Sequence, residues 1–339
     1  MKKNLLLIPI YFLILFNLSC KKSPTEVIDN TQPGRRDYVW TVDTLIADDW
    51  FGINEVWGSS PNDIWIVAGG VSSKDCLWHY NGIKWTKSAQ RLSPGLSSIF
   101  GFTTDDIWAG DTFKTIWKYD GSKWYKFQEL SMVGYDRIVV EDIYGITQES
   151  LFAVGFVDNN NGSGYKGAIL KYDGSKWNFL SIPNMQVGFN YIRNTNDGNY
   201  LITATNYDSG FLYKTYIYDG DKTLKEIYSD YNWPSMFKLN GELFVSINKK
   251  IYKYRNRGLE LWKDFLGVEY HGTVLGKNVK DFFCTGPDGI MHYNGTDMLL
   301  LFPTKLDCMG ALIFEKDVFF TEYNSGKGLY TIIRGTLQN

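Results

Sequence analysis

Residues 106–124 read DIWAGDTFKTIWKYDGSKW, and this stretch contains the pattern that organises the rest of the chain. It begins with DIW at 106–108, an aspartate followed by an apolar and an aromatic residue. It continues into YDG at 119–121, which is typical of a tight hairpin because aspartate and glycine tolerate positive φ. Trp124 then opens another apolar segment. With the apolar residues just upstream, the stretch predicts four short strands at 98–102, 106–110, 115–119 and 123–128.

Both parts of this pattern recur along the chain. Good copies of the DIW tripeptide stand at 63–65, 281–283 and 317–319, and degenerate copies stand at 150–152, 199–201 and 242–244. The hairpin signal recurs as YDG or YNG at 80–82, 172–174, 218–220 and 293–295. The seven tripeptides follow one another at intervals of about 42 residues, the period of four-stranded propeller blades. We therefore predict an all-β fold, a seven-bladed β-propeller of four-stranded antiparallel blades.

The last repeat, from Ala311 to Arg334, shows only three strands. The missing strand is found at the other end of the propeller, because Tyr38–Leu45 (YVWTVDTL) resembles the fourth strands at 84–87 (KWTK) and 123–126 (KWYK). An N-terminal strand that completes the last blade would hide two sheet edges and close the ring. The prediction is a single propeller domain over residues 38–336, closed by its N-terminal strand.

The segment WGSSPNDIW at 57–65, together with the YDGxxW hairpins, carries a resemblance to known proteins. It resembles the repeats of bacterial secreted and lipoprotein β-propellers and, more distantly, the Asp-box repeats of the sialidase-like propeller superfamily. The resemblance covers about 300 residues and implies architecture alone, because propellers of this kind include enzymes, assembly factors and binding modules.

Residues 1–20 resemble a bacterial lipoprotein signal peptide. Lys2 and Lys3 are followed by an apolar run from Leu5 to Phe16, and Ser19 precedes Cys20. In that family the cysteine is acylated, and the alternative is ordinary signal cleavage beside an incidental cysteine. Residues 21–37 are polar and contain Pro and Gly, so we expect a flexible tether. The expected location is the bacterial cell envelope, with the protein anchored in the membrane by its N-terminal lipid.

Export would place the remaining three cysteines in an oxidising compartment. Cys284 falls at the end of a predicted second strand, and Cys308 falls in the connection that leaves the same blade. We predict a Cys284–Cys308 disulfide and a free Cys76.

Several function classes are disfavoured by composition. The chain has 35 Lys and Arg against 37 Asp and Glu, which gives no electrostatic footprint for nucleic acid. It has three histidines and no HExxH, GxSxG, P-loop or Rossmann pattern, so we expect no metal and no cofactor. His79 and His292 precede the hairpin tyrosines and are predicted to lie on the strand surface. The aspartates of the tripeptides are predicted to cap backbone N–H groups in turns.

One face of the propeller is predicted to carry the binding site. Connections from fourth to first strands and from second to third strands emerge on that face, and they are long and irregular: 88–97, 129–142, 157–166, 183–190, 206–211, 229–235, 265–272 and 303–310. Binding sites concentrate on such loops. Trp50 and Trp233 are the two tryptophans outside the repeated positions, and both fall there. The further candidate ligand-binding residues are Tyr135, Arg137, Tyr231, Tyr270 and His271, and the neighbouring carboxylates are Asp48, Asp49, Asp136, Asp230 and Glu269.

Exposed aromatic rings beside carboxylates suit a glycan or the anchor residues of a protein partner. The expected function is therefore a lipid-anchored binding or scaffold module without enzymatic activity. The alternative is a glycan hydrolase or lyase that uses two of these carboxylates as acid and base. In a further alternative, Trp50 and Trp233 only fill the channel or pack between blades.

Overall fold

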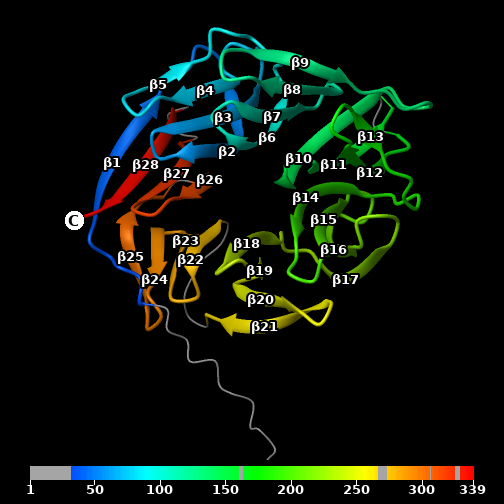
Figure 1. The fold of residues 1–339 in the computed structure, drawn as a ribbon. Coiled ribbons are helices and arrows are strands. Elements are labelled where there is room, and N and C mark those ends of the chain that lie inside the picture. The colour runs from blue at the N-terminus through cyan, green and yellow to red at the C-terminus, as the bar shows by residue number, and fades with distance from the viewer. Residues whose placement is uncertain (1–31, 160–162, 266–272, 306, 325–328) are drawn as a thin grey trace, which may run out of the picture. The chain divides into compact units, whose positions relative to one another are not determined.

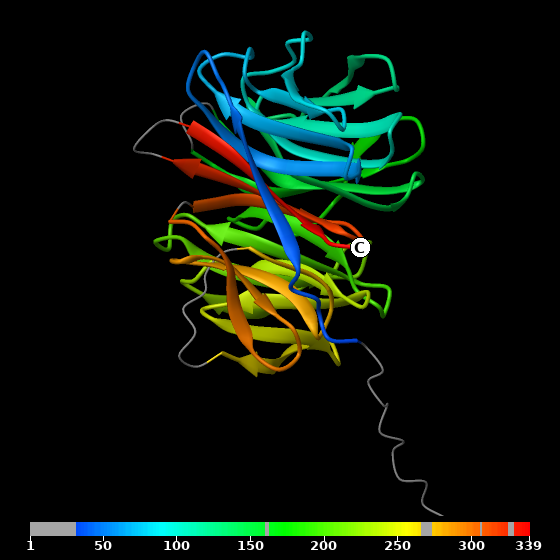
Figure 2. The ribbon, with the colours of Figure 1, turned by 90° about the vertical axis from the view of Figure 1, so that its left-hand side faces the viewer.

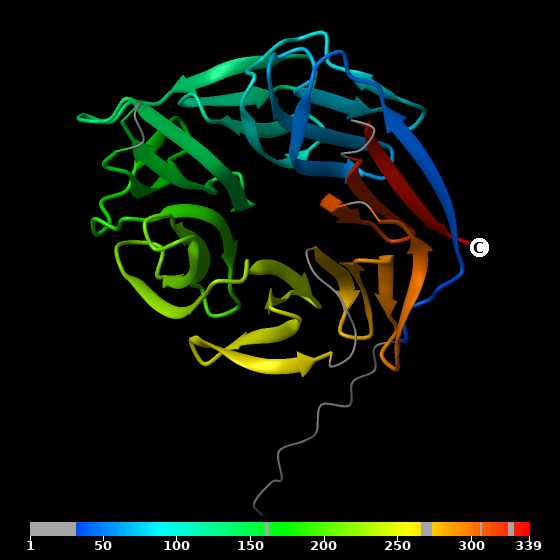
Figure 3. The same cartoon turned by 180° about the vertical axis from the view of Figure 1, so that it is seen from behind.

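In the part of the chain that the structure describes, twenty-eight β-strands form seven four-stranded antiparallel sheets arranged as a ring (Figure 1 and Figure 3). The computed structural model describes residues 32–159, 163–265, 273–305, 307–324 and 329–339. The predicted seven-bladed β-propeller is confirmed. Within the described residues no helix is long and apolar enough to cross a membrane.

Each blade contributes one strand to each of four concentric positions. The innermost strands, which surround the channel, are β2 (Phe51–Ser60), β6 (Leu96–Thr103), β10 (Arg137–Thr147), β14 (Gly188–Asn194), β18 (Ser235–Leu239), β22 (Val274–Asn278) and β26 (Asp307–Ile313). The second strands are β3 (Asp63–Gly70), β7 (Asp106–Asp111), β11 (Ser150–Asp158), β15 (Tyr200–Asn206), β19 (Glu242–Ile247), β23 (Asp281–Gly286) and β27 (Asp317–Asn324). The third strands are β4 (Leu77–Tyr80), β8 (Thr115–Tyr119), β12 (Lys166–Tyr172), β16 (Leu212–Tyr218), β20 (Lys250–Arg255), β24 (Gly289–Tyr293) and β28 (Leu329–Leu337). The outermost strands are β5 (Trp85–Lys87), β9 (Trp124–Glu129), β13 (Trp177–Phe179), β17 (Leu224–Asp230), β21 (Gly258–Asp264), β25 (Met298–Pro303) and β1 (Tyr38–Leu45).

We number the blades 1 to 7 in the order of their innermost strands, so that blade 1 begins with β2 and blade 7 with β26. Connections into the first and third strands of each blade lie on one face of the ring, which we call the long-loop face. Connections into the second and fourth strands lie on the opposite face, which we call the short-turn face.

The hydrophobic core lies between adjacent blades. Between blades 2 and 3, the fully buried ring of Trp108 packs against Tyr172 and Trp177, with ring centroids 5.0 and 5.6 Å away. Equivalent clusters join blades 1 and 2, 3 and 4, 5 and 6, 6 and 7, and 7 and 1. Because the apolar side chains are used between blades, the innermost strands are free to present polar residues to the channel.

The aspartates of the repeated tripeptide have a role that the sequence did not reveal. Each pairs with a basic side chain on the third strand of its own blade, as in Asp106 with Lys118 at 3.1 Å and Asp281 with His292 at 2.9 Å. The same pairing joins Asp63 to His79, Glu242 to Lys253 and Asp317 to Arg334. His292, predicted at the surface, is fully buried. An ion pair between neighbouring strands therefore replaces the predicted turn capping.

The N-terminal strand closes the ring, as predicted. Strand β1 pairs antiparallel with β28, from Tyr38 opposite Leu337 to Leu45 opposite Tyr330 (Figure 2). Leu45 is buried in the core between blades 7 and 1. The last blade thus takes its outermost strand from the start of the domain.

The chain reaches β1 along blade 6. The Gly34 N–H donates to the Lys280 carbonyl at 2.8 Å, and the Arg36 guanidinium donates to the carbonyls of His292 and Asp297 at 3.0 and 2.6 Å. A side chain at position 34 would collide with Asp281 and His292, which explains the glycine. Residues 34–36, which the sequence places at the end of the tether, are thus bound to the short-turn face.

The cysteine pairing has to be corrected. Cys76, Cys284 and Cys308 are all free thiols, so the predicted Cys284–Cys308 disulfide is not formed, whereas Cys76 is free as predicted. Successive residues of a strand face opposite sides of the sheet. Cys284 therefore points to the core between blades 5 and 6, while Cys308 packs against the core between blades 6 and 7. The sheet of blade 6 separates the two side chains.

Candidate functional site

The structure places three of the candidate binding residues on the long-loop face with exposed rings. The exposed fractions are 61% for Trp50, 69% for Tyr231 and 47% for Trp233. Trp50 lies in the connection between β1 and β2, and Tyr231 and Trp233 lie in the connection between β17 and β18. Tyr270 and His271 fall outside the described residues.

Two other candidates are engaged within their own blade. The Arg137 guanidinium forms a bidentate ion pair with the buried Asp158 and lies 5.4 Å from the centre of the Phe156 ring. The ring of Tyr135 packs against the core between blades 2 and 3, with the Lys166 ammonium 4.9 Å from its centroid. Both side chains stabilise the end of blade 3 that faces the long loops.

The nominated carboxylates hold loops rather than forming an acid–base pair. Asp48 binds the Lys87 ammonium at 2.9 Å, and Asp49 accepts from the Ser72 hydroxyl at 2.8 Å. Asp230 accepts from the Asn232 N–H at 2.8 Å, closing its turn. Glu269 lies outside the part of the chain that the structure describes.

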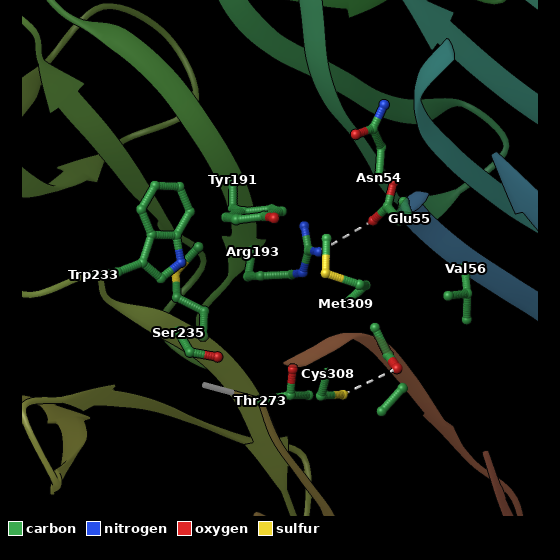
Figure 4. A pocket seen from close by; sticks show the side chains of 13 residues that line it. Asn54, Glu55, Val56, Tyr191, Arg193, Trp233, Ser235, Thr273, Cys308 and Met309 are labelled. Atoms are coloured by element: carbon green, nitrogen blue, oxygen red, sulfur yellow. Dashed lines mark hydrogen bonds and ion pairs between the residues drawn. The ribbon is translucent and has the colours of Figure 1, made fainter. Parts of the chain in front are cut away.

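An enclosed polar space lies in the channel itself, in two adjoining chambers. The larger, which we call the channel cavity, has a volume of about 470 Å³ and is lined by residues of the innermost strands together with Trp233. Figure 4 shows Glu55, Tyr191, Arg193 and Met309 around it. The smaller, the side chamber, has about 130 Å³ and shares Asn54, Glu55, Tyr191 and Trp233 with the cavity. Of the nominated residues that the structure describes, Trp233 lines both chambers, whereas Trp50 lines neither.

β-bulges explain which side chains reach these chambers. The innermost strands of blades 1, 2, 3, 4 and 7 each have a register shift at the same position of the repeat. This position lies two residues before an apolar residue that opens a recurrent inner-strand motif, apolar-aromatic-Gly, as at 56–58 in blade 1. A bulge leaves one residue unpaired and re-aims its side chain. The bulged residues are Asn54, Ser97, Glu141, Asn190 and Met309, and the first four line the side chamber.

A buried cluster of three charges crosses the channel between blades 1, 3 and 4. Arg193 forms an ion pair with the buried Asp142, and its other terminal nitrogen lies 4.0 Å from the Glu55 carboxylate. Glu55 also accepts from the Ile99 N–H and Asp142 from the Ile192 N–H, both at 2.8 Å. Burial raises the pKa of both carboxyls, and their mutual repulsion raises the pKa of Glu55 further, while Arg193 opposes these effects.

Glu141 differs from these two carboxylates because nothing neutralises it at close range. It is half-buried in the wall of the side chamber, and no described residue forms a hydrogen bond or ion pair with its carboxylate. Burial raises the pKa of Glu141 to about 7, although the more distant Arg137 opposes the shift. The chamber therefore holds a carboxyl group that titrates near neutral pH.

The geometry fits recognition of charge better than acid–base catalysis. Glu55 and Asp142 share one guanidinium and accept from backbone N–H groups, so neither has the freedom that a catalytic carboxyl needs. Among the described residues no group of three His, Cys, Asp or Glu side chains could hold a metal ion.

The sequence reasoning missed these channel residues, although two signals were available. The inner-strand motif reads apolar-aromatic-Gly at 56–58, 99–101 and 143–145, but the fourth repeat has Arg193 in the aromatic position. Polar pairs, Asn54-Glu55 and Glu141-Asp142, directly precede the motif in the first and third repeats. Each is a departure from an otherwise apolar pattern at the same place in the ring.

Comparisons with known proteins find solved structures of similar fold but no related sequence family. No family model matches the chain, and no curated protein sequence matches it. A structure of YCF48 bound to D1 peptide matches with a TM-score of 0.62 and 14% identity over 91% of this chain and 100% of that one. YCF48 from Cyanidioschyzon merolae matches with a TM-score of 0.57 and 11% identity over 87% and 98% of the two chains. BBS1N in complex with ARL6DN matches with a TM-score of 0.57 and 12% identity over 90% of this chain and 98% of that one. The chain is therefore similar in fold to β-propellers of different kinds.

Proposed function

We propose that this protein is a lipid-anchored scaffold of the bacterial cell envelope that binds a protein partner on its long-loop face. The observation that carries the proposal is the distribution of large apolar side chains exposed in the connections between strands. On the long-loop face these are Ile46, Trp50, Val71, Phe113, Val133, Tyr207, Phe211, Tyr231 and Trp233. On the short-turn face, within the described residues, Ile83 is the one in a connection, and Ile146 is exposed at the end of β10. Exposed apolar and aromatic groups gathered on one side are typical of protein-binding surfaces.

The structural neighbours support a protein partner. YCF48 was solved with a bound D1 peptide, and BBS1N was solved with ARL6DN, so propellers of similar fold hold polypeptide ligands. Three of the carboxylates that the sequence nominated for glycan chemistry, Asp48, Asp49 and Asp230, are bound within their own loops or to Lys87. We therefore favour a protein over a glycan.

The proposed anchor is compatible with this use of the long-loop face. The chain enters β1 from the short-turn face, where Gly34 and Arg36 are bound to blade 6. A lipid on Cys20 would thus attach the domain from the side opposite to the exposed apolar residues.

Site-specific photo-crosslinking in the producing bacterium tests the proposal. A photoreactive phenylalanine analogue replaces Phe113 or Tyr231 on the long-loop face, with Ile83 on the short-turn face as the matched control. We expect both long-loop positions to form an adduct with the same protein, and the Ile83 position to form none. Equal adducts on both faces, or adducts with glycan instead of protein, would contradict the proposal.

The anchor and the alternative activity need separate measurements. Cys20→Ala should move the protein from the membrane fraction to the soluble fraction, and retention in the membrane would refute lipid anchoring. Incubation with a panel of envelope glycans, scored for retention and for released product, examines the hydrolase or lyase alternative. We expect neither.

A further inference from the structure

We propose that the side chamber receives the positively charged end of a lysine or arginine side chain from the partner protein. This inference rests on the proposed function and names the chemistry of the residue that would anchor the partner. It follows from the charge balance of the channel, from the hydrogen-bonding groups left open in the chamber wall, and from the aromatic rings beside them.

The channel has more carboxylates than cations. Glu55 and Asp142 share one guanidinium, that of Arg193, and Glu141 adds a third carboxyl group in the wall of the side chamber. Arg193 is committed to Asp142 and to the Ile192 carbonyl, and the second carboxylate oxygen of the fully buried Asp142 has no hydrogen-bond partner among the described residues. An anion would be repelled here, whereas a cation would relieve the repulsion.

The neighbouring cationic side chains do not balance the excess of carboxylates, because they are bound to other groups. The Arg137 guanidinium is held by Asp158. The Lys238 ammonium binds the Tyr144 hydroxyl at 3.1 Å and the Asn194 side-chain oxygen at 2.5 Å. Among the described residues, no cation is therefore bound directly to Glu141.

The chamber wall offers several hydrogen-bond acceptors. The Asn54 amide nitrogen donates to the Leu96 carbonyl at 2.6 Å, which fixes its orientation and leaves its Oδ1 without a donor among the described groups. The Ser97 hydroxyl donates to the Val140 carbonyl, so its own lone pairs stay available. With the Glu141 carboxylate these groups can accept hydrogen bonds, and an ammonium or guanidinium supplies several donors.

Aromatic rings complete the chamber. The indole of Trp233 is held edge-on against Tyr213 and Tyr191, with ring centroids 4.9 and 6.1 Å away. Almost half of Trp233 is exposed, and it lines the chamber with Tyr191. Cations bind well within about 6 Å of such rings, and Arg193 already lies 5.6 Å from the Tyr191 ring centre. The Tyr191 ring thus already contacts one cation, Arg193, and the Trp233 ring is available to a second cation.

The inference predicts a pH dependence. The titratable and charged groups that surround Glu141 are Arg137 and Asp142 on β10, Glu55 on β2, Tyr191 on β14 and Tyr207 in the connection between β15 and β16. A cation binds the ionised form of Glu141, whose pKa is raised to about 7 by burial. Affinity should therefore rise about tenfold between pH 6 and pH 8 as this carboxyl loses its proton.

The test uses amino-acid amides as probes. The full chain is labelled with 5-fluorotryptophan, and the Trp233 resonance is assigned by its loss in Trp233→Phe. N-acetyl-lysine and N-acetyl-arginine methylamides are titrated against their neutral counterparts, the norleucine and citrulline methylamides. We expect the cationic probes to shift the Trp233 resonance saturably with at least tenfold higher affinity. Equal affinities of cationic and neutral probes would overturn the inference.

Single substitutions show which side chains bind the cationic probe. Glu141→Gln should weaken binding of the lysine probe at least tenfold at pH 8 and reduce the pH dependence to the part that Glu55 contributes, because the pKa of Glu55 is also raised, to about 8. Asn54→Ala should weaken binding several-fold. Glu149→Gln is the matched control, because Glu149 is an exposed glutamate of the same blade in the turn on the short-turn face. An unchanged affinity in Glu141→Gln, with the wild-type melting temperature, would refute the assignment.

Failure of this inference and failure of the proposed function can be told apart. If the probes do not bind but Phe113 and Tyr231 still crosslink a protein, only the cation chamber is refuted. If the probes bind and crosslinking is equal on both faces, the chamber stands and the partner-binding face is refuted.

Discussion

Replacing Leu45 with alanine should weaken the closure of the ring more than any other single truncation in β1. Leu45 is the last residue of that strand and is 1% exposed. It lies in the core between blades 7 and 1, in the same cluster as Phe51, Tyr330 and Ile332. The rest of the strand contributes pairing and partly exposed side chains, so Leu45 is its main apolar anchor.

The magnitude follows from the burial of this side chain. Truncating a fully buried leucine to alanine costs about 2–5 kcal/mol, from lost transfer free energy and from the cavity left behind. In a domain of this size, 1 kcal/mol corresponds to about 2 °C of melting temperature, so we expect a decrease of about 4–10 °C.

Thermal and urea unfolding of the full chain measure the effect. Val42→Ala is the matched control, because Val42 lies in the same strand, three residues earlier, with 51% of its side chain exposed. That change should stay within about 0.5 kcal/mol of wild type. If Leu45→Ala were as stable as Val42→Ala, β1 would not close the ring through its buried end, and the reasoning would fail.

Three further outcomes follow from burial and charge. Trp233→Ala should change the unfolding free energy by less than about 1 kcal/mol, whereas Trp108→Ala, in the core, should cost about 3–5 kcal/mol; equal losses in thermal melts would contradict this. Mass spectrometry without reduction should find Cys284 and Cys308 alkylated only after denaturation, because burial raises the pKa of both thiols; a disulfide between them would refute it. Burial raises the pKa of Glu322 to about 7, so the folded state keeps a proton that the unfolded state loses, and stability should fall by about 3 kcal/mol from pH 5 to pH 8. Glu322→Gln should flatten that slope in urea titrations, and an unchanged slope would assign it to other groups.

The fold was predictable because every blade repeats the same pattern of turn residues and apolar residues. The strands predicted at 106–110 and 115–119 correspond to β7 and β8, and the missing strand of the last blade was found in Tyr38–Leu45. Local turn chemistry and apolar spacing determine each blade separately. Seven copies of one signal made the register clear even where single copies are degenerate.

The channel site was not predictable in the same way, because it joins residues from different blades. Glu55, Asp142 and Arg193 come from three innermost strands, and their contact depends on how far the ring brings these strands together. The bulges that place Asn54 and Glu141 in the side chamber are register shifts, which the alternation of residue types does not reveal. The disulfide prediction failed for a related reason. Proximity along the chain did not show that Cys284 and Cys308 lie on opposite sides of one sheet.

The innermost strands can vary without loss of the fold, and this explains why the site is found there. A side chain of a second strand, such as Trp108, is enclosed between two blades, so a polar replacement would be buried without a partner. The bulged positions Asn54 and Glu141 face the channel, where polar groups meet solvent or one another. Arg193 stands where neighbouring repeats have an aromatic residue, and its charge is met by Asp142 of the adjacent blade 3. Departures from the repeat are therefore tolerated where they can meet a ligand, and the side chamber is assembled from such departures.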